Sequence, residues 1–452
     1  MPSIGNRVSR WTPAILACAL VNFIAAQALV AAGFGWPVAA EAAPVTLIDV
    51  HLLTVGWLTL LMFGALFQFV PVITSRNLLT QHLSLAALVL LELGLACMVG
   101  GFLLLGSGMA AVLLPVGGGL VASGALAGIV NLLVPLTGKR PLPLSARFVL
   151  AGLVFLLLTI ALGITFGLAL TVPSLGGALA PVVASGVEYH VLAGIGGWFT
   201  LTAIGVSYEL LPMFMLAPHD RGAWGSAVLW IGVAGFAMAF GAGLAHLALI
   251  ETIGRAAIGL ALALYLIDVV RLYRSRRRRR IELHNRAVIG AFACLGLALL
   301  AAAAADISGE LAEAAPPLLV LLLFGWLSGL GLSQLYKIVP FLAWLSRFGR
   351  RLGSGAVPRV QDLVREPAAL PLFAIYFVAV AIATFAAWLG LAAFVRGAMV
   401  LSVGATLLLT REYWRAWQGH YVSAGHEPTA PSLPFGLERK EAAHVRSNAP
   451  HA

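Results

Sequence analysis

Two histidines in the first half of the chain have a setting that suits metal binding. His51 lies six residues before Trp57, and His190 lies eight residues before Trp198, each near the start of a long apolar segment. A neutral imidazole is a good ligand for haem iron or copper. For a single histidine, a hydrogen bond to a nearby loop is the alternative interpretation. The matched depth expected for the two on related segments, with His246 expected at the same level, favours a shared haem or metal site.

Other ionisable side chains lie within apolar segments, where each costs about 2.5–3.5 kcal/mol at a helix centre. Glu92 is near the middle of one segment and is either a proton-relay carboxyl or a protonated packing residue. Glu251 and Arg255 are four residues apart on one helical face and can form an ion pair. These three residues are the candidates for a proton or charge relay. Lys337 is expected to extend toward the headgroups.

The segments that carry the histidines belong to a threefold repeat. Each copy has a Gly-Trp pair and a proline fourteen residues after the tryptophan, in the pairs Trp57 and Pro71, Trp198 and Pro212, and Trp326 and Pro340. The residue three positions before each proline is polar: Gln68, Glu209 and Lys337. The third copy has no histidine. Three spaced copies of one pattern predict threefold internal pseudo-symmetry.

Composition places the chain in a membrane. Hydrophobic residues make up 61% of the sequence and charged residues only 10%, so most side chains must face lipid or other apolar helices. The net charge of +10 does not indicate nucleic acid, because the basic residues lie in short loops between apolar runs. The three cysteines fall inside these runs without the spacing of a metal site.

The sequence predicts an all-α polytopic membrane protein, with twelve transmembrane helices in three pseudo-symmetric groups of four. Residues 1–412 form a single transmembrane domain, and residues 413–452 form a polar cytoplasmic tail that we expect to be disordered. The first span is interpreted as an anchor rather than a signal peptide because its apolar run is long. Because about twenty apolar residues cross a bilayer, we place the spans at about 12–33, 46–73, 83–106, 109–136, 145–173, 187–215, 224–243, 246–271, 287–305, 316–345, 370–393 and 395–412.

The loop charges predict the orientation. Loops rich in Lys and Arg alternate with loops around residues 34–45, 174–186 and 306–315 that have almost none. The positive-inside rule therefore places both termini in the cytoplasm and the three candidate histidines near the outer leaflet of a bacterial inner membrane. The basic run at residues 274–280 is interpreted as a topology anchor, with binding of anionic lipid headgroups as the alternative.

The layout and motifs resemble a known family. Twelve spans in three groups, with histidines on the second helix of a group, resemble subunit I of the haem-copper oxidases and nitric oxide reductases. The recognisable motifs are His51…Gly56-Trp57…Gly64…Pro71-Val-Ile-Thr and His190…Gly197-Trp198…Gly205…Tyr208…Pro212. They are similar to those of divergent oxidase-subunit-I-like proteins and of the nitric-oxide-response haem–copper membrane proteins.

The resemblance implies roles for individual histidines. His51 matches the oxidase ligand of the low-spin haem in helix and depth, and His190 is the nearest match to the copper ligand of helix six. The adjacent His-His pair expected near helix seven is absent, and only His246 occurs there. The His-x-His of helix ten is also absent. The resemblance therefore implies an oxidoreductase fold with an incomplete ligand set, and leaves open whether the chain is an enzyme.

We therefore expect a membrane protein that binds haem, copper or both through His51 and His190, with His246 as a further ligand. Its role would be electron transfer, metal handling or a nitric-oxide response, and the resemblance implies a cytochrome c or another redox partner on the outer face. The rival functions are a secondary transporter, in which Glu92, Glu251 and Arg255 line the pathway, and a cofactor-free assembly subunit of a respiratory complex.

Overall fold

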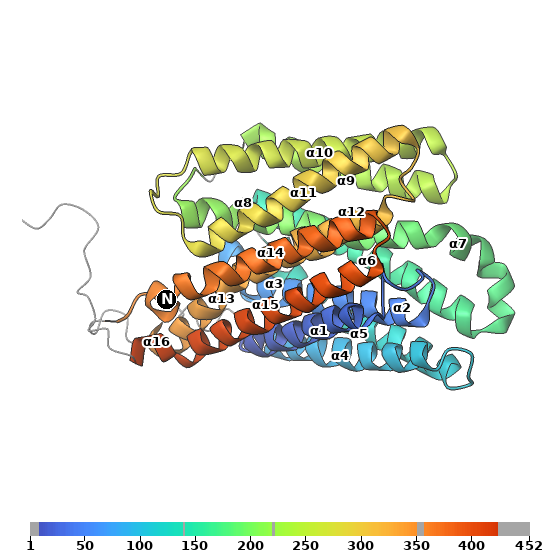
Figure 1. Cartoon of the computed structure of the whole chain (residues 1–452), viewed down its shortest axis with the longest axis horizontal. Coiled ribbons are helices and arrows are strands. Elements are labelled where there is room, and N and C mark those ends of the chain that lie inside the picture. The colour runs from blue at the N-terminus through green and yellow to red at the C-terminus, as the bar shows by residue number, and fades with distance from the viewer. Residues whose placement is uncertain (1–8, 139–140, 219–221, 350–356, 424–452) are drawn as a thin grey trace, which may run out of the picture.

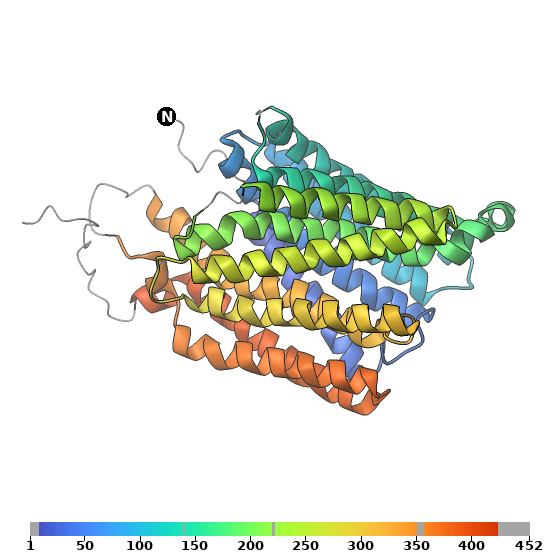
Figure 2. The same ribbon diagram turned by 90° about the horizontal axis from the view of Figure 1, so that it is seen from above.

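The computed structural model describes residues 9–138, 141–218, 222–349 and 357–423. In these residues the chain is all-helical, without strands, and twelve of its helices are long and apolar enough to cross a membrane. The helices run along the long axis of the molecule in both views (Figures 1 and 2). Many large apolar side chains on the outer helices are exposed, among them Leu249, Leu300 and Trp388, as a lipid-facing surface requires. The all-α membrane fold is thus confirmed.

The helices form three groups of four spans. The first group is α1 (Thr12–Ala32), α2–η2–α3 (Pro44–His51, Leu52–Thr59, Leu60–Thr74), α4 (Gln81–Leu103) and α5 (Ala110–Thr137). The second is α6 (Leu144–Thr171), α7–η3–α8 (Pro173–Val191, Leu192–Thr200, Leu201–Met215), α9 (Gly222–Leu244) and α10 (Ala248–Arg274). The third is α11 (Leu283–Ser308), α12–η4–α13 (Ala315–Leu319, Val320–Ser328, Gly329–Phe348), α14 (Glu366–Trp388) and α15 (Ala392–Gln418).

Packing relates the three groups as the sequence repeat predicts. In each group the first helix lies along the second span, and the last two helices pair with each other. The groups contact one another through α5 and α6, α10 and α11, and α15 and α1, which closes a ring. The second spans are innermost: 67, 72 and 89% of their apolar windows are buried, against 50% or less for the other nine spans.

Each second span contains a π-helical stretch, η2, η3 or η4, and the Gly-Trp pair lies inside it. The tryptophans are almost fully buried, Trp57 and Trp326 at 0% exposure and Trp198 at 1%. The indole Nε1 of Trp57 donates to Ser328 Oγ at 2.9 Å, which joins the first and third groups. π-Helical turns are rare and occur often at functional sites. The three related stretches therefore make the residues around them candidates for a functional site.

At the ends of the second spans, the polar residues before the prolines fasten each group to the start of its own first helix. Gln68 Nε2 donates to Thr12 Oγ1 at 2.8 Å, and Ser145 Oγ donates to Glu209 at 3.4 Å. Lys337 Nζ donates to Glu282, the residue before α11, at 2.7 Å. Lys337 thus pairs with a carboxylate near the end of its span, and its expected extension toward the headgroups stays a prediction. We call this end of the bundle the basic end and the opposite end the histidine end.

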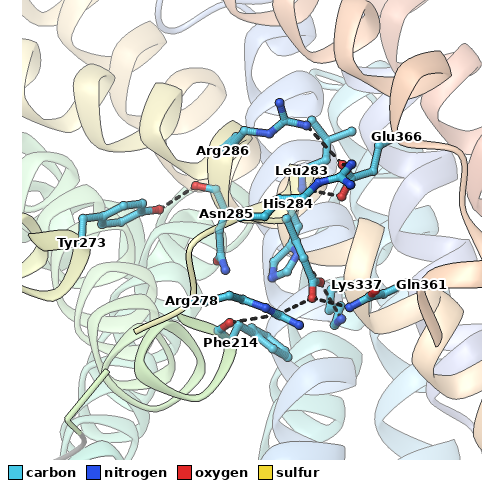
Figure 3. A network of polar contacts seen from close by, with 12 residues as sticks. Phe214, Tyr273, Arg278, Leu283, His284, Asn285, Arg286, Lys337, Gln361 and Glu366 are labelled. Carbon is cyan, nitrogen blue, oxygen red and sulfur yellow. Dashed lines mark hydrogen bonds and ion pairs between the residues drawn. The ribbon is translucent and has the colours of Figure 1, made fainter. Parts of the chain in front are cut away.

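Glu282 collects donors from three segments. Besides Lys337, it accepts from Gln361 Nε2 at 2.9 Å and from Arg278. Figure 3 shows Arg278, Lys337 and Gln361 pointing toward one another. Burial alone would raise the pKa of Glu282, but the hydrogen bond and charge of Lys337, with His284 and Arg278, bring that pKa below its ordinary value of 4.5.

We expect this carboxylate to make stability depend on pH. Because the folded pKa is lowered, the contact stabilises the fold fully above pH 4.5 and is lost as the pH falls through the folded pKa. At pH 7, Glu282→Gln should lower the thermal midpoint by a few degrees, and the difference from wild type should shrink below pH 4.5. The exposed Glu313→Gln is the control and should match wild type throughout. An equal loss for Glu282→Gln at pH 7 and pH 3.5 would contradict this assignment.

Several predicted boundaries move. Residues 174–186, expected to form a loop, belong to helix α7, which protrudes beyond its neighbours at the histidine end (Figures 1 and 2). Pro173 occupies the first turn of α7, where proline is tolerated, and the stretch is rich in alanine. The eleventh span begins at Glu366 and ends at Trp388, about five residues earlier than expected.

The start of the predicted tail is also helical. Helix α15 continues to Gln418, and the short helix α16 (His420–Ser423) follows it. Glu412 holds this extension, because it accepts from Arg415 at 2.9 Å and from Tyr421 at 2.6 Å. The remainder of the predicted tail, 424–452, lies outside the described residues.

Candidate histidine site

His51 is the last residue of α2, immediately before the π-helical stretch η2. Its Nδ1 lies 2.6 Å from the carbonyl oxygen of Leu47, one turn earlier in the helix. The half-buried ring packs against Phe102 of α4, with 5.4 Å between ring centroids. A carbonyl oxygen only accepts, so this hydrogen bond places the proton of the neutral imidazole on Nδ1 and the lone pair on Nε2.

His190 lies at a similar place in the second group, but its carbonyl partner belongs to a different helix. It lies one residue before the end of α7, just ahead of η3, and its Nδ1 is 3.0 Å from the carbonyl oxygen of Thr159 on α6. The half-buried ring contacts Phe166 edge-on, with 5.6 Å between centroids. The same argument therefore leaves Nε2 of His190 as a lone-pair donor.

The structure places both imidazoles at the histidine end of the bundle, just ahead of η2 and η3. Neither Nε2 has a hydrogen-bond partner in the part of the chain that the structure describes. A metal-binding histidine usually donates its other ring N–H to a carbonyl or carboxylate, which fixes the tautomer and the ring plane. His51 and His190 both have this second partner already, and aromatic rings cover both.

The acids two residues before these histidines do not serve them. Asp49 is buried and accepts the backbone N–H of Trp36, so it fixes the loop between α1 and α2. Glu188 is exposed. This agrees with the helical geometry, in which residues two apart point to different faces. The ring partners are instead carbonyl oxygens, which no side-chain pattern in the sequence could show.

His246, the third candidate ligand, is exposed in the turn between α9 and α10, with a left-handed φ of 56°. It was expected at the start of the eighth span, but α10 begins at Ala248. Among the described residues, no three His, Cys, Asp or Glu side chains are grouped so that they could hold a metal ion. The arrangement at the histidine end is therefore a pair of imidazoles.

Glu92 lies beside η2. Asn22, a residue that the sequence analysis did not single out, donates from Nδ2 to Glu92 Oε1 at 2.9 Å and to the carbonyl of Gly56 at 3.3 Å. A Cβ on Gly56 would lie 2.7 Å from Asn22 Cγ, so glycine allows this close approach. Asn22 thus connects the membrane carboxyl of α4 to the π-helical backbone through α1.

Glu251 and Arg255 form the expected ion pair, at 2.7 Å, and Arg255 also reaches Asp306 on α11 at 3.2 Å. The hydroxyl of Tyr189, the neighbour of His190, hydrogen-bonds to Glu251. These four side chains therefore join α7, α10 and α11 near the histidine end. Arg255, between two carboxylates, holds the second and third groups together.

The histidine end therefore offers two imidazole Nε2 atoms that have no hydrogen-bond partner among the described residues. Two imidazoles complete the axial ligation of a haem iron, whereas a structural zinc site takes four ligands and a typical copper site at least three. The sequence matches none of the protein-family models and none of the curated proteins with which it was compared.

Proposed function

We propose that this integral membrane protein binds haem between the histidine ends of its first and second groups, with Nε2 of His51 and His190 as ligands. The proposal rests on one observation: two histidines at the same end of repeat-related spans each have Nδ1 engaged by a backbone carbonyl. The alternative form of this proposal is that the same two nitrogens bind copper instead of haem. Its third ligand would have to come from outside this pair of histidines.

The residues around the pair fit a haem. Leu47 and Thr159 orient the two rings, while Phe102 and Phe166 cover them and limit the access of water. A haem held by His51 and His190 would supply one-electron transfer. We therefore propose electron transfer, metal handling or a nitric-oxide response, without the complete binuclear centre of an oxidase. The resemblance to oxidase subunit I supports this proposal through the shared layout of histidines on second helices.

The position of the pair fits a partner outside the cell. If the positive-inside rule holds, the basic end faces the cytoplasm of a bacterial inner membrane, with both termini, and the histidine end faces outward. A cytochrome c or another redox protein would then exchange electrons at the outer face. The haem and metal content of wild-type protein, compared with the two histidine variants, tests the proposal.

One observation favours a transporter as the second candidate. Glu92 and Asn22 form a polar pair within the apolar bundle, against the π-helical backbone at Gly56. Polar groups beside irregular helices are typical of transport pathways. If this is the function, Glu92→Gln abolishes flux in proteoliposomes, whereas the haem proposal expects the bound pigment to survive that change.

A further inference from the structure

A pocket of about 450 Å³ lies at the basic end, far from the histidine pair. The pocket is surrounded by the loop from α10 to α11, the middle of α13, the short helix η6 (Val360–Leu363) and the start of α14. This volume falls in the range of about 300–1,000 Å³ that small-ligand sites occupy. Figure 3 shows the polar side chains of this region converging from several helices.

The pocket is lined by more positive than negative charge. Four cationic side chains line it (Arg278, Arg280, Lys337 and Arg365) and two acidic ones (Glu282 and Glu366), so two positive charges remain when both acids are neutralised and His284 is uncharged. Each acid already has cationic partners: Glu282 has Lys337 and Arg278, and Glu366 has Arg280 and Arg286, both at 3.3 Å.

Arg365 is the exception among these cations. It is exposed, and its guanidinium makes no hydrogen bond or ion pair with any residue that the structure describes. A guanidinium without a carboxylate partner, at the edge of a pocket with excess positive charge, can bind a phosphate through two parallel hydrogen bonds.

Two buried polar groups in the lining also have no partner. Within the described residues, neither Nε2 of His284 nor the hydroxyl of Tyr336 makes a hydrogen bond, although the two residues are only 1% and 4% exposed. Nδ1 of His284 lies 3.4 Å from Glu282, which leaves Nε2 as an acceptor. Buried polar groups without partners are costly, so each calls for a partner such as a ligand.

We propose that this pocket binds a phosphate ester that also has hydroxyl groups. Arg280 and Arg365 bind the phosphate, the hydroxyl of Tyr336 donates to the ligand, and Nε2 of His284 accepts from a ligand hydroxyl. The headgroup of an anionic phospholipid such as phosphatidylglycerol has this chemistry, and so does soluble glycerol phosphate. The pocket is independent of the histidine site and of its cofactor.

The alternative interpretation of the basic run is that it only fixes the topology of the chain, and it leads to a different expectation. If the arginines serve only to retain this loop at one membrane surface, any two of them should be equivalent. Arg277 and Arg279 are exposed members of the same basic run that do not line the pocket. The double variants Arg280→Gln/Arg365→Gln and Arg277→Gln/Arg279→Gln remove the same charge from the same end of the bundle and form a matched pair.

The test is native mass spectrometry of the full-length protein in detergent, titrated with phosphatidylglycerol and with phosphatidylcholine. Removing the two lining arginines should weaken phosphatidylglycerol binding about thirtyfold, at about a tenfold change per 1.4 kcal/mol and about 1 kcal/mol per basic residue. The control pair should stay within about threefold of wild type. Tyr336→Phe, which keeps every charge, should also weaken binding. Equal effects of the two pairs, or none in either, would overturn the proposal.

Soluble glycerol phosphate distinguishes the two sources. The ligand is a soluble ester if glycerol phosphate displaces phosphatidylglycerol from the wild-type protein. It should then also raise the thermal midpoint of wild type but not that of the Arg280→Gln/Arg365→Gln variant. If only the lipid binds with this dependence on Arg280 and Arg365, the ligand is a membrane headgroup. If wild type binds neither probe more tightly than the Arg280→Gln/Arg365→Gln variant does, the proposed site is ruled out.

Discussion

Alanine at either His51 or His190 is expected to remove the bound haem. Loss of a group that only hydrogen-bonds to a ligating histidine costs about 10–100-fold in metal affinity, so loss of the histidine itself should cost at least about 100-fold. Purified His51→Ala and His190→Ala should therefore contain less than about a tenth of the wild-type haem or copper. The measurement is metal and haem content per chain, with absorbance followed through size-exclusion chromatography.

His246→Ala is the matched control. It removes an imidazole from the same end of the molecule, but from an exposed turn, so the pigment should remain. Loss of pigment in this variant would make His246 a third ligand. Full retention of pigment in both His51→Ala and His190→Ala would show that the pair is not the site.

Gly254→Leu is expected to prevent folding. A Cβ at this position would lie 2.5 Å from the backbone nitrogen of Ala239 and 2.9 Å from the carbonyl oxygen of Gly235, so α9 and α10 could not keep their contact. Backbone atoms cannot move aside as a side chain can, and the cost should exceed about 4 kcal/mol, the upper range for single substitutions. The variant should give little or no monodisperse protein in fluorescence-detected size exclusion.

Gly241→Leu is the control for that change. It adds the same side chain to α9 at a position where no heavy atom lies within 4 Å of the new Cβ, so yield and thermal midpoint should match wild type. Comparable yields of monodisperse Gly254→Leu and Gly241→Leu would contradict the close contact. The first group has a similar contact, since a Cβ on Gly94 would lie 2.9 Å from the oxygen of Gly117.

Much of the fold could be predicted from the sequence because a bilayer restricts the choices. Runs of apolar residues require helices, since no water is present to satisfy an open backbone. The Gly-Trp pairs and their prolines showed the repeat. The same close contact with the first helix recurs in each group, since Gly56 faces Asn22, Gly197 faces Phe155 and Gly325 faces Cys294. The residues that form the second spans were thus identifiable, as were the two histidines near their starts.

Other features could not be predicted, because they depend on partners distant in the sequence. Thr159 orients His190 through its carbonyl, which any residue there could supply. The same holds for the π-helical stretches, whose hydrogen bonds leave no mark on residue type. The contact of Lys337 with Glu282 could not be predicted either, because Glu282 precedes it by 55 positions in the sequence. The charge pattern showed the basic run but not which of its arginines line a pocket.

The most direct test of the haem proposal is the dithionite-reduced minus oxidised optical spectrum of wild-type protein, with iron and copper measured in the same sample. The protein should be expressed with haem precursor and copper both supplied. We predict a Soret band, a sharp α-band and about one haem iron per chain, since one pair of axial imidazoles serves one iron. A colourless protein with copper would retain the histidine pair as ligands and exclude haem. A protein with neither haem nor copper would contradict the account and leave transport as the better explanation.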